Sequence, residues 1–160
     1  MTRRSAALGT ATFLVVPGTV AGLVHCWLTG WDVSHPQGVA ARIAGVCLIV
    51  AGTAALLSAF VRFAIDGIGT PAPTAPTERL VVSGLYRYVR NPMYLAVVAV
   101  ITGQAVVLGD SGLLVYAGAV ALTMHTFAVA YEEPTLRREF GAEYDAYCDA
   151  VPRWLPRLQR

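Results

Sequence analysis

The sequence predicts an all-α integral membrane protein, a bundle of about four transmembrane helices followed by an amphipathic C-terminal helix on the cytoplasmic side. Hydrophobic residues make up 56% of the 160 residues and charged residues only 14%, whereas soluble domains carry about 25% charged residues. The mean hydropathy of +0.56 supports the same class. The charged residues also gather between four long apolar stretches.

These four stretches have about the length that a helix needs to cross a bilayer, roughly 20 residues. They are residues 6–28, 43–61, 91–108 and 112–131, within a single membrane domain of residues 1–160. The third stretch reaches a spanning length only if residues 91–93 belong to it. Pro17 predicts a kink in the first helix, because proline lacks a backbone donor.

The N-terminus has a second interpretation. Arg3 and Arg4 followed by an apolar run also describe a signal peptide. That run is longer than the usual apolar region of a signal peptide, and no clear small-residue cleavage site precedes the next polar loop. We therefore expect a retained helix.

Arginine placement orients the bundle, because basic residues concentrate in cytoplasmic loops. The chain has no lysine, and its arginines lie at the N-terminus, around the middle loop at residues 63–90 and in the tail at residues 132–160, with Arg42 as the exception. We therefore expect an integral protein of the bacterial inner (plasma) membrane with both termini in the cytoplasm. The net charge of +2 gives no indication of nucleic-acid binding.

The middle loop contains a glycine pair and a proline run. Pro71, Pro73 and Pro76 favour an extended, polyproline-like path. Residues 66–69, Asp-Gly-Ile-Gly, resemble a fragment of a nucleotide-binding loop, but they follow a membrane helix rather than a strand and lack the third glycine. We interpret them as a plain turn.

The tail has one apolar helical face, since its large apolar residues recur every three or four positions. These residues are Leu136, Phe140, Tyr144, Tyr147 and Val151. Glu132, Glu133 and Pro134 suit a helix start, although the helix can equally continue the fourth span. Gly141 weakens the middle of the tail helix and Pro152 ends it. The helix either lies on the membrane surface, with Trp154 as an interfacial anchor, or covers a site at the cytoplasmic face.

Ionisable groups in a membrane helix are costly, and a functional role is the first hypothesis for them. His125 precedes Glu132 by seven residues, and two helical turns place both on one face. An interhelical hydrogen bond explains His125 equally well. Cys26, Cys47 and Cys148 are far apart, and no metal-ligand spacing, nucleophile elbow or phosphate loop is present.

Two motifs carry a family resemblance. SGLYRYVRNPMYL at residues 83–95 and EEPTLRREFGAEYDAYCDAVPRWLP at residues 132–156 resemble the isoprenylcysteine carboxyl methyltransferase and phospholipid methyltransferase superfamily. Its members are small integral membrane enzymes that use S-adenosyl-L-methionine. The resemblance covers about residues 71–156, and the predicted helices fit the rest.

The resemblance implies a pocket for S-adenosyl-L-methionine. The implied cofactor-binding residues are Glu78, Arg79, Leu80, Val81, Tyr86, Asn91, Pro92, Met93, Tyr94 and Glu132. The catalytic residues stay open, with Arg90, Asn91 and His125 as candidates. Prenylcysteine enzymes commonly have histidine in place of Asn91, and a substrate-contacting arginine in place of Ala128. Both departures argue against a prenylcysteine carboxylate as the acceptor, and asparagine cannot act as a titrating base.

The charges of the cofactor suit these residues. Glu132 can accept hydrogen bonds from its ammonium or hydroxyl groups. Arg87 or Arg90 can pair with its carboxylate or with lipid phosphate, and tyrosine faces can contact its sulfonium. Taken alone, the arginines and tyrosines of the first motif would indicate only interfacial anchors.

Three functions follow from the sequence. The first is an S-adenosylmethionine-dependent methyltransferase, similar to isoprenylcysteine carboxyl methyltransferase, that methylates oxygen or sulfur of a lipophilic acceptor. The second is phospholipid N-methylation, and the third is a non-catalytic membrane scaffold. The expected partners are a lipophilic small molecule or lipid substrate and membrane lipid, without nucleic acid or metal.

Overall fold

The computed structural model describes residues 37–66 and 79–156 of the chain. All regular elements in these ranges are helical, which confirms the predicted all-α class for this part. In chain order they are α3 (Val39–Asp66), the 3-10 turn η2 (Gly84–Arg87), α4 (Pro92–Leu108), α5 (Ser111–Phe127), the π-helical turn η3 (Ala128–Glu132), α6 (Glu133–Phe140) and α7 (Ala142–Ala150). The predicted first span at residues 6–28 lies outside the described residues, as do residues 67–78 of the middle loop.

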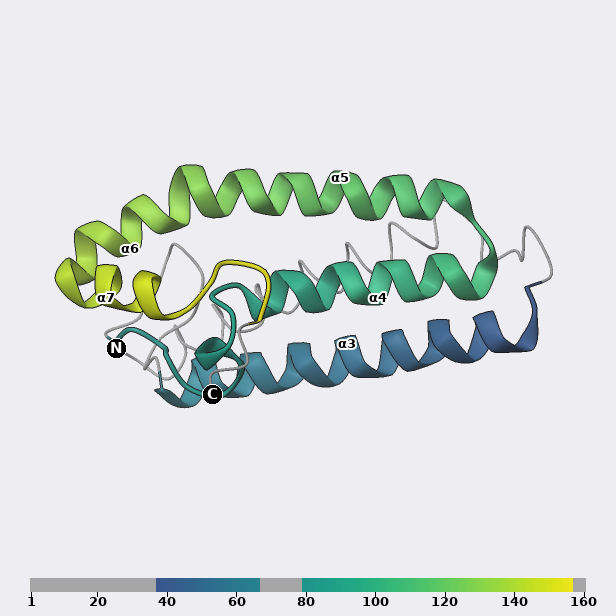
Figure 1. Ribbon diagram of the computed structural model, residues 1–160, viewed down its shortest axis with the longest axis horizontal. Coiled ribbons are helices and arrows are strands. Elements are labelled where there is room, and N and C mark those ends of the chain that lie inside the picture. Colours follow the sequence, from purple (N-terminus) through teal and green to yellow (C-terminus); the bar gives the residue numbers. More distant parts are fainter. Residues whose placement is uncertain (1–36, 67–78, 157–160) are drawn as a thin grey trace, which may run out of the picture.

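Helix α4 lies between α3 and α5 (Figure 1). Its buried residues are Pro92, Met93, Ala96, Val97, Val100, Ile101, Gly103, Ala105 and Leu108. They cover a broad part of the helix circumference, as expected of a helix that packs against two others, whereas Leu95 on the remaining face is exposed. A short turn joins α4 to α5, and Asp110 caps the start of α5, because its Oδ1 accepts hydrogen bonds from the backbone N–H groups of Gly112 at 2.7 Å and Leu113 at 3.3 Å.

Among the helices of the described residues, two are long and apolar enough to cross a membrane. One comprises the 24 residues Val39–Arg62, and the other comprises the 30 residues Ser111–Phe140. Most of their large apolar side chains point outward, among them Val50 on α3 and Val115 on α5, as expected where lipid replaces water as the surroundings. Helix α4 is apolar but shorter, with 17 residues.

The backbones of α3 and α4 approach closely at three glycines. A Cβ atom at Gly103 would lie 2.7 Å from the carbonyl oxygen of Gly45, and one at Gly52 would lie 2.9 Å from the carbonyl oxygen of Ala96. Small residues at such crossings let membrane helices pack by van der Waals contact. The α3–α4 pair therefore forms a tight base on which the rest of the described chain is arranged.

The tail confirms the alternative that its helix continues the fourth span, but it is not a single helix. The fourth helix continues without a break through η3 into α6, and the chain then turns at Gly141, whose φ of +51° favours glycine. The predicted apolar face is present, but Tyr144, Tyr147 and Val151 pack with Leu80 from the segment before η2. The tail helices α6 and α7 thus fold back over the chain that leads into α4 (Figure 1).

Candidate active site

The candidate site lies at the end of the bundle where α4 begins and α5 ends. Pro92 occupies the first turn of α4, where its missing N–H costs no helical hydrogen bond. Asn91 precedes it with a non-helical backbone conformation, φ −120° and ψ 58°. This arrangement starts α4 abruptly and places Tyr94 in its first turn, opposite the end of the α5–η3 helix.

Tyr94 and Glu132 form the central contact of the site. The Tyr94 hydroxyl donates a hydrogen bond to Oε1 of Glu132 at 2.6 Å. Glu132 is the last residue of the η3 π turn, in which each hydrogen bond encloses one residue more than in an α-helix. None of the ion pairs within residues 37–66 and 79–156 involves Glu132, so this carboxylate has an aromatic hydroxyl for a neighbour and no arginine.

Glu133 has the opposite surroundings. Its carboxylate is buried and accepts hydrogen bonds from Nε and Nη2 of Arg153, at 2.5 Å and 2.9 Å. Nη1 of Arg90 lies 3.5 Å from the same carboxylate. The hydrogen bond to Glu133 raises the pKa of the Arg153 guanidinium, so that group stays charged. The charge of Glu133 is therefore compensated within the protein, whereas no arginine among the described residues pairs with Glu132.

The segment after α7 closes over the start of α4. The carbonyl oxygen of Pro152 accepts a hydrogen bond from the backbone N–H of Arg90 at 2.9 Å. The carbonyl oxygen of Arg153 accepts one from Nδ2 of Asn91 at 3.4 Å. Two predicted site residues, Arg90 and Asn91, are thus in direct contact with the C-terminal segment. The candidate site therefore includes the end of the second motif.

Trp154 belongs to this closing segment rather than pointing away as an interfacial anchor. Its Nε1 donates a hydrogen bond to Nδ1 of His125 at 3.1 Å, and its ring centroid lies 6.4 Å from that of Tyr94. His125 therefore holds the Trp154 ring in this arrangement.

The other predicted site residues divide into two groups. Val81, Tyr86 and Met93 are buried together against Ala59 of α3, and the hydroxyl of Tyr147 donates to the carbonyl oxygen of Tyr86 at 2.7 Å. Burial raises the pKa of Tyr86, and the neighbouring ionisable groups of Tyr147 and Glu132 raise it further, so its phenol stays neutral.

The second group comprises residues that lie farther from the Tyr94–Glu132 contact, together with one residue outside the described ranges. Arg79 is exposed, Leu80 packs against the tail, and Glu78 lies outside the described residues. Arg90 is held by Glu133 and by the Cys148 thiol. The structure therefore brings together the side chains of Tyr86, Tyr94 and Glu132, with Asn91 at the edge beneath the closing segment.

Comparison with known protein families identifies the family of the chain. The family model described as phospholipid methyltransferase matches residues 40–143, which is more than half of the chain. The chain belongs to the phospholipid methyltransferase family. No curated protein matches it. The family match confirms the resemblance that the two motifs indicate, and it makes the chain a membrane methyltransferase of a family that acts on lipid-like substrates.

The matched range of the phospholipid methyltransferase family includes Tyr94 and Glu132 but ends before the closing segment. Arg153 and Trp154 were not among the site residues that the sequence implied. Both residues lie within the second motif, at residues 132–156, but the motif does not identify their distant partners Glu133 and His125. Within residues 37–66 and 79–156, the structure contains no group of three His, Cys, Asp or Glu residues that could hold a metal ion.

Proposed function

We propose that this phospholipid methyltransferase family member binds S-adenosyl-L-methionine between the first turn of α4 and the η3–α6 segment, and transfers its methyl group to a lipophilic acceptor. The observation that carries the proposal is the contrast between the two adjacent glutamates. Glu133 is compensated by two arginines, whereas Glu132 is bound only to the Tyr94 hydroxyl among the described residues.

The residues present fit the cofactor in three respects. Glu132 can accept hydrogen bonds from an ammonium or from ribose hydroxyls, with a charge-assisted gain. The rings of Tyr94 and Trp154, 6.4 Å apart, offer aromatic faces to a positive sulfonium. Nε of Arg90 is buried without a hydrogen-bond partner in the described part of the chain, so one donor stays available for an anionic group at this end.

When bound, the cofactor supplies an electrophilic methyl group. The residues of the chain then act by position, because a methyl transfer in line with the leaving sulfur needs alignment more than acid–base help. Tyr94 orients the Glu132 carboxylate, and Glu133 with Arg153 fixes the helix end that carries it. The closing segment and the apolar cluster around Tyr86 exclude water, which strengthens electrostatic contacts inside the site.

For the acceptor we propose oxygen or sulfur of a lipophilic small molecule, as in enzymes similar to isoprenylcysteine carboxyl methyltransferase. His125 is hydrogen-bonded to Trp154 and Asn91 cannot titrate, and we assign neither as a base. We therefore propose an acceptor that reacts without a strong internal base. The family match favours a second candidate, an amine of a phospholipid headgroup. A non-catalytic scaffold is the alternative of another class.

Titration of detergent-purified protein with S-adenosylhomocysteine tests the cofactor site. We expect saturable binding and a loss of about tenfold or more in affinity for Glu132→Gln, the cost of one charge-assisted hydrogen bond. Glu143→Gln, an exposed glutamate on α7, is the matched control and should leave affinity unchanged. Unaltered affinity in Glu132→Gln refutes the proposed site, and absence of any binding by the wild type favours a scaffold.

A second experiment identifies the acceptor class. Membranes containing the protein are incubated with cofactor labelled in the methyl group, and the lipids are extracted. Label in a neutral lipophilic product, as a base-labile methyl ester or a stable ether or thioether, supports the first candidate. Label in phospholipid supports the second and contradicts the first.

A further inference from the structure

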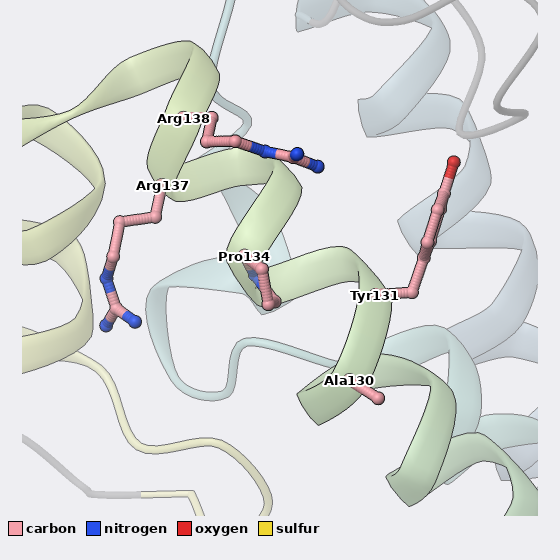
Figure 2. A pocket seen from close by; sticks show the side chains of 5 residues that line it. All are labelled: Ala130, Tyr131, Pro134, Arg137 and Arg138. Carbon is pink, nitrogen blue, oxygen red and sulfur yellow. The ribbon is translucent and has the colours of Figure 1, made fainter.

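A hollow on the surface of this chain lies away from the Tyr94–Glu132 contact. It has a volume of about 480 Å³ and is lined by Ala130, Tyr131, Pro134, Arg137 and Arg138, all from the η3–α6 helix. Figure 2 shows Tyr131 and Arg138 pointing to one side of this helix, with Pro134 between them and Arg137 on the other flank. Because Ala130 and Pro134 are each two positions from Glu132, the hollow faces away from the candidate active site.

The position of the hollow across the bilayer follows from the length of the helix that lines it. About 20 helical residues cross the hydrocarbon core of a bilayer. Counted from Ser111, where the helix begins, that length ends near Tyr131. Tyr131 then lies at the depth where aromatic residues are enriched in membrane proteins, and the two arginines lie one to two turns farther, among the lipid headgroups.

The aromatic side of the hollow is open. Phe127 and Tyr131 stack with ring centroids 5.1 Å apart, yet their exposed fractions are 42% and 45%. An exposed aromatic pair at the boundary of the core suits contact with an acyl chain and the glycerol ester region above it. The polar end of the same hollow must then accommodate a headgroup.

The charge at that polar end is positive and only partly compensated. Nε of Arg137 donates to Oδ1 of Asp145 at 2.7 Å, which fixes the position of this guanidinium. Nη2 of Arg138 donates only to the Thr135 hydroxyl, at 3.1 Å, and no acidic residue within residues 37–66 and 79–156 forms an ion pair with it. The guanidinium of Arg138 therefore offers a planar set of donors that matches a phosphate.

We propose that this hollow is a binding site for an anionic phospholipid, with the phosphate on Arg138 and one acyl chain along Tyr131 and Phe127. The site is distinct from the site of methyl transfer, because it lies on the opposite side of the helix that carries Glu132. It binds lipid as a component of the membrane, whichever acceptor the enzyme methylates.

The test is a binding titration of the full chain, purified in a neutral detergent. Short-chain phosphatidylglycerol is compared with a diacylglycerol of the same chain length, which lacks phosphate, and with inorganic phosphate, which lacks acyl chains. We expect saturable binding of phosphatidylglycerol alone, with its apparent Kd raised about tenfold by Arg138→Gln, because a charge-assisted contact to phosphate is lost.

Arg42→Gln is the matched control, because Arg42 is an exposed arginine near the start of α3. The start of α3 lies at the end of the bundle opposite to α6 (Figure 1). It should leave the Kd for phosphatidylglycerol unchanged, and Arg138→Gln should leave binding of S-adenosylhomocysteine unchanged, which separates this proposal from the proposed function. Equal loss in Arg42→Gln and Arg138→Gln would show a general charge effect and overturn the site. Equal binding of diacylglycerol or of inorganic phosphate would overturn the lipid-phosphate assignment.

Discussion

Glu132 and Glu133 are neighbours of the same residue type, and their side chains meet different elements. Glu132 reaches Tyr94 on α4, and Glu133 reaches Arg153 after α7 and Arg90 before α4. The first carboxylate is the one that we propose to bind the cofactor, while the other joins three segments of the chain. The two roles lead to opposite expectations for the same substitution.

Glu133→Gln should lower the free energy of unfolding by about 2–3 kcal/mol. Breaking a buried ion pair costs about 3–5 kcal/mol, and the partial exposure of Arg153, 32% of its side chain, reduces that cost. Glu132→Gln should change stability by less than about 1 kcal/mol, because glutamine can still accept from the Tyr94 hydroxyl. Denaturant unfolding in detergent measures both, and a larger loss for Glu132→Gln would reverse the assignment.

At the scale of elements, the contact between α3 and α4 depends on the absence of side chains. Gly45 and Gly103 each lie against the carbonyl oxygen of the other. Backbone atoms cannot move aside as the end of a flexible side chain can, so a methyl group there must push the helices apart. The relative position of α4, and with it Tyr94, follows from this contact.

Gly103→Ala should therefore lower the free energy of unfolding by about 1–3 kcal/mol, the usual cost of overpacking. Gly118→Ala is the matched control, since Gly118 is also in a helix interior but has nothing within 4 Å of an added Cβ atom. That control should be neutral or stabilising by up to about 1 kcal/mol, because alanine favours helix. Thermal unfolding of both variants decides, and an equal response would contradict the close-contact explanation.

At the scale of the whole molecule, the α4–α5 turn and the tail lie at opposite ends of the described bundle (Figure 1). Single cysteines at Ser111 and Asp149, in a variant without Cys26, Cys47 and Cys148, should react with a membrane-impermeant thiol reagent from opposite sides. The arginine distribution predicts that Asp149 is the cytoplasmic one. Labelling of right-side-out and inverted vesicles checks this, and reaction of both positions from one side would contradict it.

Much of the described fold follows from local sequence. Pro92 and Asp110 mark the beginnings of α4 and α5, and the apolar runs between charged residues set the helices in between. Helix α3 extends beyond the predicted end at residue 61 to Asp66, because nothing in the residues that follow, Arg62 included, prevents a further turn. Gly141 was visible as a weak point, but its positive φ and the separation of α6 from α7 are properties of the folded chain.

The candidate site was predictable only in part. Its motif residues Tyr94 and Glu132 do meet, as two halves of one motif pair would suggest. The distinction between Glu132 and Glu133 has no sequence signal, since it depends on the direction in which each side chain points. Trp154 was equally well suited to a membrane interface, and only the position of His125 in space explains why its ring turns inward.

The π turn at Ala128–Glu132 changes how distances along this chain translate into directions. Each hydrogen bond of a π turn encloses one residue more than that of an α turn, so seven residues from His125 to Glu132 do not give two regular turns. Removing a single residue from this turn would restore α-helical spacing and swing everything after it by about 100°. Glu132 would leave Tyr94, and the arginines of the outer hollow would rotate toward a different part of the membrane. The one extra residue of the π turn therefore fixes the direction of Glu132 and the direction of the outer hollow together. A deletion or insertion in this turn should be far less tolerated than a substitution.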